Sequence, residues 1–157
     1  DKKMAYFDAR VSEANPTVEI RVADVCRWVD QPVLLAALGR ALVETAALEW
    51  RHGVPPVPAR IEMLRVASWR AARSGLSGEL VDVHAGGVPR PARQVVGALL
   101  AHVRPALERW AEWEEMSALA TSLMDRGTGA SAQRAVHART GSLADVARDA
   151  VLATQLS

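Results

Sequence analysis

A short alternating segment near the start of the chain carries the residues best suited to chemistry. In residues 17–24, Val18, Ile20 and Val22 alternate with Glu19 and Arg21, a period of two that predicts a half-buried β-strand. Residues two apart on a strand share a face, so the Glu19 carboxylate and the Arg21 guanidinium point away from the apolar side chains. This face could be a cross-strand ion-pair lattice, which spacing alone favours. It could also be a substrate floor, with the carboxylate on a divalent cation and the arginine on a phosphate or carboxylate.

The segment before it adds two more charged residues. Residues 5–11 also alternate, with Asp8 and Arg10 on the polar side, and turn-forming sequence that ends in Asn15-Pro16 separates the two segments. The pattern predicts an antiparallel hairpin whose polar face carries these two residues together with Glu19 and Arg21. Because a two-stranded hairpin is marginally stable alone, we expect it to pack on later helices or to be completed by polypeptide outside this chain.

A second charged pair lies further along, in the segment Trp69-Arg70-Ala71-Ala72-Arg73. Arg70 and Arg73 are three apart on a predicted helix, so they share a face and could clamp an anionic group. The same spacing is typical of solvated charge covering a helix, and physics alone favours that interpretation.

Other motifs indicate structure rather than chemistry. The glycine-rich segment 126–130 lacks the lysine and the spacing of a P-loop, and a glycine that ends one helix with Thr128 capping the next explains it equally well. The four histidines have no ligand spacing, so no zinc site is expected. Cys26 is typical of a small buried hydrophobe. We find no convincing general base or nucleophile.

Composition narrows the class of protein. The 157 residues fit one domain, 1–157, and a net charge of +1 without a long basic run argues against nucleic-acid binding driven by bulk charge. No apolar run approaches the roughly 20 residues that a membrane span needs. The single cysteine excludes an internal disulfide and fits a reducing compartment. Asp1-Lys2-Lys3 does not lead into a signal peptide, so the expected location is cytoplasmic.

After Asp24 the apolar period changes to three and four, which predicts helices. We expect an α+β fold, with a sheet-forming hairpin over 1–24 and a mostly helical bundle of about six helices over 25–157. A small second hairpin is expected near 80–89, turning at Gly86-Gly87. The expected helices cover approximately residues 30–51, 59–74, 91–110, 114–126, 130–139 and 143–154.

The order of these motifs resembles the carboxylate–amine ligase family, also called the type 2 glutamate–cysteine ligase-like family. The resemblance is carried by segments in sequence order: Asp8-Ala9-Arg10, residues 16–24, residues 69–76, residues 80–82, residues 126–134 and residues 139–143. It covers nearly the whole chain but corresponds only to the carboxyl-terminal part of such an enzyme. The family often has asparagine just before the tryptophan, where this chain has Ser68, which weakens the case for a site at the neighbouring arginines.

The resemblance implies an ATP-dependent ligase with a glutamine-synthetase-like catalytic sheet, which forms an amide through an acyl phosphate. Glu19 would then be a magnesium ligand and Arg21 a catalytic clamp on phosphate or carboxylate. Arg10, Arg70 and Arg73 would bind substrate, with Asp8 as a secondary contact.

The implied partners are the amino-terminal half of the enzyme, a glutamate-like carboxylate and an amine. The isolated chain is expected to be inactive, and a homo-oligomer is left open. The alternative is a non-catalytic helical interaction module that retains the ligase scaffold.

Overall fold

The computed structural model describes residues 8–155 and begins with the expected antiparallel hairpin. Strands β1 (Ala9–Val11) and β2 (Val18–Ile20) pair with Arg10 opposite Glu19. The pairing extends one step further, because the backbone N–H of Arg21 donates to the carbonyl oxygen of Asp8 over 2.8 Å. Both strands are shorter than the alternating sequence, and residues 5–7 of the predicted first strand lie outside the described part of the chain.

Helix α1 (Asp30–Arg51) is the spine of the fold and packs against α3 (Ala92–Arg109) and α4 (Trp113–Arg126). The core forms where these three helices meet, and Val103 and Leu107 are completely buried there. The other buried members of this core are small or flexible apolar side chains: Leu34, Ala37, Ala41, Ala106, Met116 and Ala120. The expected α+β class, a hairpin followed by a largely helical body, is confirmed.

A second layer covers one end of α3. Helix α2 (Ile61–Ser74) ends at Gly75, whose φ of 56° suits a residue without a Cβ. A short 3-10 helix, η2 (Gly75–Ser77), leads into β3 (Glu79–Asp82), which pairs antiparallel with β4 (Val88–Pro91). The predicted second hairpin and the helix stop at Gly75 are both confirmed.

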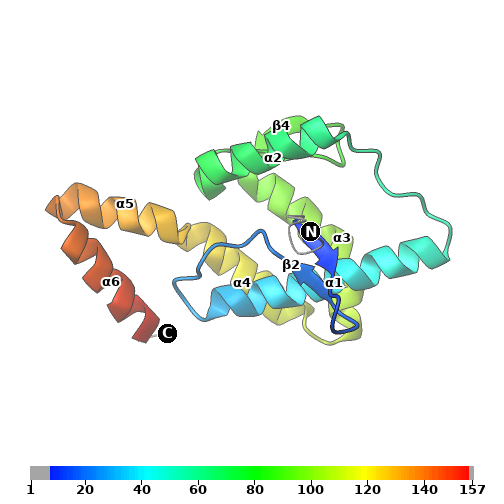
Figure 1. Cartoon of the computed structure of the whole chain (residues 1–157), viewed down its shortest axis with the longest axis horizontal. Coiled ribbons are helices and arrows are strands. Elements are labelled where there is room, and N and C mark those ends of the chain that lie inside the picture. Colours follow the sequence, from blue (N-terminus) through cyan, green and yellow to red (C-terminus); the bar gives the residue numbers. More distant parts are fainter. Residues whose placement is uncertain (1–7, 156–157) are drawn as a thin grey trace.

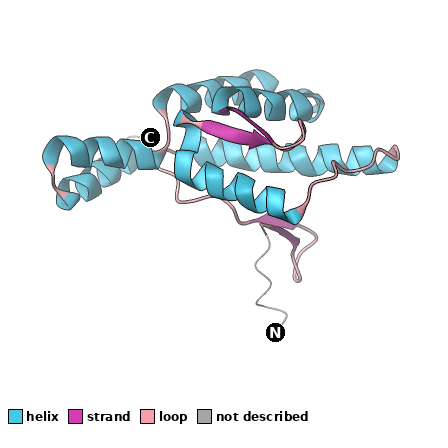
Figure 2. Ribbon diagram, turned by 90° about the horizontal axis from the view of Figure 1, so that it is seen from above, coloured by secondary structure: helices cyan, strands magenta, loops and turns pink. Residues whose placement is uncertain are grey.

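Helices α5 (Gly129–Thr140) and α6 (Leu143–Gln155) form a pair that projects from one end of the body (Figures 1 and 2). The hydroxyl of Thr128 accepts a hydrogen bond from the backbone N–H of Ser131 over 3.2 Å, and Ser142 caps α6 through Asp145 in the same way. The glycine-rich segment is therefore a helix stop followed by an N-cap, one of the interpretations that the sequence supports. Within residues 8–155, no helix combines the length and the apolar character needed to cross a membrane.

Candidate functional site

The polar face of the first hairpin holds a direct ion pair. The Nε of Arg10 donates to Oε2 of Glu19 over 2.7 Å, and the two side chains are 30% and 38% exposed. Local sequence explains the geometry, because the register places these two residues opposite each other and apolar neighbours turn their side chains outward. The prediction that Arg10 and Glu19 share one face is confirmed.

Electrostatics keep the Glu19 carboxylate ionised. The hydrogen bond from Arg10 lowers the pKa of Glu19, and the positive charges of Arg10 and Arg21 and a hydrogen bond from Ser12 act in the same direction. Partial desolvation opposes them, but the pKa remains below its usual value. The charge of Arg21, just beyond the end of β2, also acts on this carboxylate, so one ionised carboxylate lies near two guanidinium groups.

A magnesium site can be tested against these donors. Mg²⁺ commonly binds to one or two carboxylates and completes its shell with water and substrate phosphates. The ionised carboxylate of Glu19 has the donor chemistry for such a role, although its Oε2 already accepts from Arg10. Among residues 8–155, no group of three or more His, Cys, Asp or Glu side chains is arranged to hold a metal ion. The described part of the chain thus offers one candidate ligand and not a full set.

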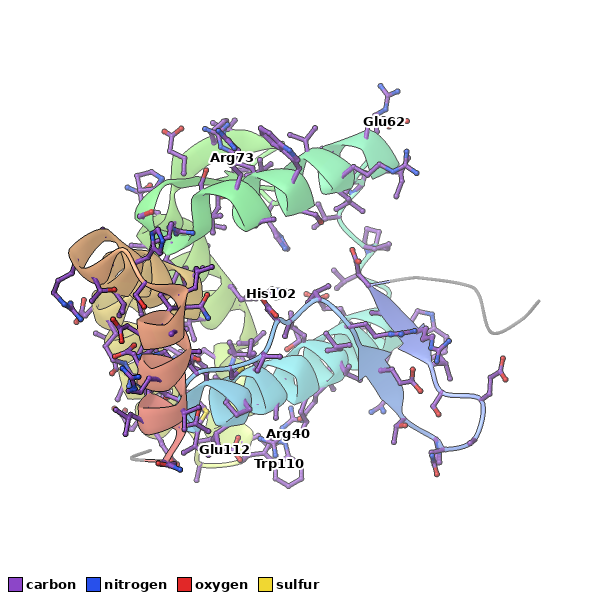
Figure 3. The ribbon with its side chains drawn as sticks, turned by 60° about the vertical axis from the view of Figure 1, so that its left-hand side comes forward. Arg40, Glu62, Arg73, His102, Trp110 and Glu112 are labelled. Carbon is purple, nitrogen blue, oxygen red and sulfur yellow. The ribbon has the colours of Figure 1, made fainter. Side chains whose placement is uncertain are left out.

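The structure does not bring Arg70 and Arg73 to this face. Both lie on α2, and Figure 3 shows Arg73 well apart from the hairpin, which lies beside α1. The Nη2 of Arg70 pairs with Oε2 of Glu79 over 2.8 Å, and its Nε donates to the Glu79 carbonyl over 3.1 Å. In this chain Arg70 therefore ties α2 to β3, and Arg73 is exposed.

The apolar face of the hairpin borders a groove of about 1130 Å³ along α1. The groove is lined by Val18, Ile20 and Val22 on the hairpin side, by residues of α1, and by Leu99 and Arg109 of α3. Ile20 approaches the helix closely, since a Cβ placed on Gly39 would lie 2.9 Å from its Cδ1 atom. The hairpin therefore has a charged outer face and an apolar inner face, and the inner face contacts α1 through Ile20.

A charged cluster that sequence reasoning missed borders the groove, and Arg40, Glu44 and Arg109 are among the residues that line it. Glu44 on α1 accepts from Arg109 Nη1 over 2.6 Å and from the indole nitrogen of Trp110 over 2.7 Å. Arg40 pairs with Glu112 and lies 5.2 Å from the centre of the Trp110 ring (Figure 3). These contacts hold the turn between α3 and α4 against α1. No local spacing in the sequence predicts them.

The fold also brings together two histidine rings that are distant in the sequence. The ring centroids of His84 and His102 are 5.3 Å apart, and Nε2 of His102 lies 3.9 Å from Oε1 of Glu49. The expectation that the histidines do not form a zinc site stays a prediction, although two of them are neighbours in space.

Comparison with known proteins decides the family. The family model of glutamate–cysteine ligase family 2 matches residues 1–150. The chain belongs to this family. No solved structure matches it.

Curated relatives named for this ligase family are similar in sequence to this chain over most of its length. A protein of Frankia alni named as a candidate glutamate–cysteine ligase 2-2 is 51% identical over 93% of this chain and 38% of its own length. A Streptomyces coelicolor protein named as a candidate glutamate–cysteine ligase 2 is 48% identical over 99% of this chain and 42% of its own length. A second Frankia alni relative is 49% identical over 98% of this chain but 18% of its own length. The chain thus spans about two fifths, or less, of these relatives.

Proposed function

We propose that this chain is part of an ATP-dependent carboxylate–amine ligase that activates a glutamate-like carboxylate as an acyl phosphate and passes the acyl group to an amine. The observation that carries the proposal is membership of glutamate–cysteine ligase family 2, together with 51% and 48% identity to relatives named for that activity. Since the chain spans 38% and 42% of those relatives, we expect the remainder of the active site, including the other metal ligands, to lie in polypeptide that these 157 residues do not contain.

The polar face of the hairpin gives its residues distinct roles in this proposal. Glu19 is the proposed magnesium ligand, and its lowered pKa favours the ionised form that a hard cation needs. When bound, Mg²⁺ would neutralise charge on phosphate oxygens. Arg21 is the proposed catalytic clamp, because a guanidinium beside this carboxylate can stabilise charge on a transferring phosphoryl group.

Arg10, Arg70 and Arg73 are the proposed substrate contacts, and the structure supports Arg10 more strongly than the other two. Arg10 uses its Nε to hold Glu19, and a guanidinium has further N–H donors on its two Nη atoms for a substrate carboxylate. Arg70 is already paired with Glu79, so a substrate at that position would compete with this carboxylate. We propose that Arg10 is the stronger substrate contact and that Arg70 and Arg73 contribute a more distant wall.

The experiment uses the full-length Streptomyces coelicolor relative and measures magnesium-dependent release of ADP with glutamate and a panel of amines. Glutamine at the position aligned with Glu19 should weaken magnesium binding and reduce turnover by about 10- to 100-fold, because an amide carries no charge to hold the cation. The matched control places glutamine at the position aligned with Glu13, an exposed residue of the hairpin turn, and should leave turnover unchanged.

Two results would contradict the proposal. Unchanged turnover and magnesium affinity after the Glu19 substitution would remove the metal role and favour the alternative of an interaction module. The isolated 157-residue chain should release no ADP with glutamate and an amine. Robust release by that chain would show that the site is complete within it.

A further inference from the structure

Helix α1 carries two apolar stripes, and the described structure covers only one of them. Leu34, Ala37 and Ala41 are buried in the core. Leu35 and Val43 belong to the second stripe, and each is 42% exposed. A helix with a wide or doubled apolar surface is expected between two packed layers, whereas a surface helix normally needs one stripe.

The hairpin covers the second stripe only in part. Ile20 approaches α1 at Gly39, yet Ile20 itself is 47% exposed and its neighbour Val18 is 43% exposed. Between the hairpin and the helix lies the groove of about 1130 Å³ described above. Contiguous apolar surface of this kind is uncommon on a soluble monomer and marks a surface that another segment covers.

We infer that this groove is the docking surface for the part of the longer ligase polypeptide that this chain does not contain. The inference deepens the proposed function and rests on it in one respect, namely that the working enzyme is longer than this chain. The relatives supply the length, because the chain spans 38% and 42% of two of them. The groove lies beside the hairpin, so one incoming segment can add a strand to a hairpin edge and place its apolar side chains on α1.

The hairpin provides a second reason for this occupant. Its sheet has two strands of three residues, and a sheet of that size is marginally stable alone. Addition of strands from the rest of the polypeptide would satisfy the open backbone groups at its edges.

A second copy of this chain is the rival occupant and fits less well. A two-fold interface brings the same surface together from both copies. Here that surface is concave, and two facing grooves would leave the space between them unfilled. A segment with a convex apolar face is the better complement.

Single-cysteine labelling of the 157-residue chain and of the full-length Streptomyces coelicolor relative tests the inference. Val43→Cys places a thiol in the groove, and Val151→Cys, on α6, is the matched control because Val151 is exposed and lies outside the groove. Both are made in the 157-residue chain with Cys26→Ser, and cysteines are placed at the aligned positions of a cysteine-free Streptomyces coelicolor relative. The rate of maleimide labelling is compared between chain and relative, each normalised to its rate in urea.

We expect position 43 to label at least about tenfold more slowly in the full-length relative, since a covered thiol reacts only when the local structure opens, and position 151 to label alike in both. Equal rates at position 43 would overturn the inference. Protection that is already present in the isolated chain and grows with its concentration would overturn it in favour of a second copy.

Labelling requires neither nucleotide nor amino acid, so its result does not depend on ligase activity. ADP release is measured on the same samples of the relative. An active relative whose position 43 labels freely refutes the docking surface alone. An inactive relative with position 43 protected refutes the ligase proposal alone.

Discussion

Gly39, in the middle of α1, offers a quantitative test of how the hairpin is seated. A Cβ at this position would lie 2.9 Å from Ile20 Cδ1, whereas a Cβ at Gly97, inside α3, would meet no atom within 4 Å. Glycine to alanine in a helix interior gains about 0.8–1 kcal/mol of stability from helix propensity. Gly97→Ala should therefore report this gain alone, and Gly39→Ala should report the gain minus the cost of moving Ile20.

The cost follows from what the new methyl group would meet. Cδ1 is the end of a flexible side chain on a residue that is 47% exposed, so Ile20 can turn aside without moving the backbone. Leaving a preferred rotamer costs about 0.5–1.5 kcal/mol. We expect Gly97→Ala to raise Tm by roughly 2–4 °C, whereas Gly39→Ala should change it little.

Urea denaturation of a double-mutant cycle isolates the contact. In an Ile20→Ala background the obstacle is gone, so Gly39→Ala should gain about 1 kcal/mol, as Gly97→Ala does in either background. Equal gains from Gly39→Ala with and without Ile20 would refute the reasoning. The hairpin would then not approach α1 at Gly39 in solution, and the groove described above would have a different shape.

Three further measurements test the core and the charged face. Leu107→Ala should lower the free energy of unfolding by about 3 kcal/mol in urea, because Leu107 is completely buried, and a loss under about 1 kcal/mol would contradict the packing. The folded pKa of Glu19 lies below its unfolded value, so its stabilising effect should be complete above about pH 4.3 and disappear as the pH falls through the folded pKa. Arg10→Met should raise this pKa toward its usual value in an NMR titration, and an unchanged midpoint would exclude the Arg10 hydrogen bond as the cause.

The helices and their ends could be predicted from the sequence because the signals are local. Apolar residues repeating at three and four predicted α1, and the structure places it at Asp30–Arg51. The glycine at 75 and the threonine at 128 were sufficient to place a helix stop and a cap. The shared face of Arg10 and Glu19 was equally accessible, because alternation across a short turn determines which residues lie on one side of a hairpin.

Contacts between distant segments could not be predicted in this way. Glu44 and Trp110 are 66 residues apart, and only the packing of α1 against α3 brings them together. The same limit applies to Arg70, since its spacing from Arg73 is compatible with an anion clamp or a solvated face. Its pairing with Glu79 depends on how the chain reverses after Gly75.

The position of the hairpin links the two proposals physically. Glu19 and Ile20 are consecutive on β2, so their side chains point to opposite faces of the same strand. A segment that docks in the groove would press on the apolar face and fix the strand, and this would also fix the Glu19 carboxylate on the other side. Sliding the register by one residue would exchange the two faces and place the charges against α1. The apolar seat on α1 is therefore a requirement for presenting the charged face outward, and docking at the groove should order the proposed magnesium ligand without touching it.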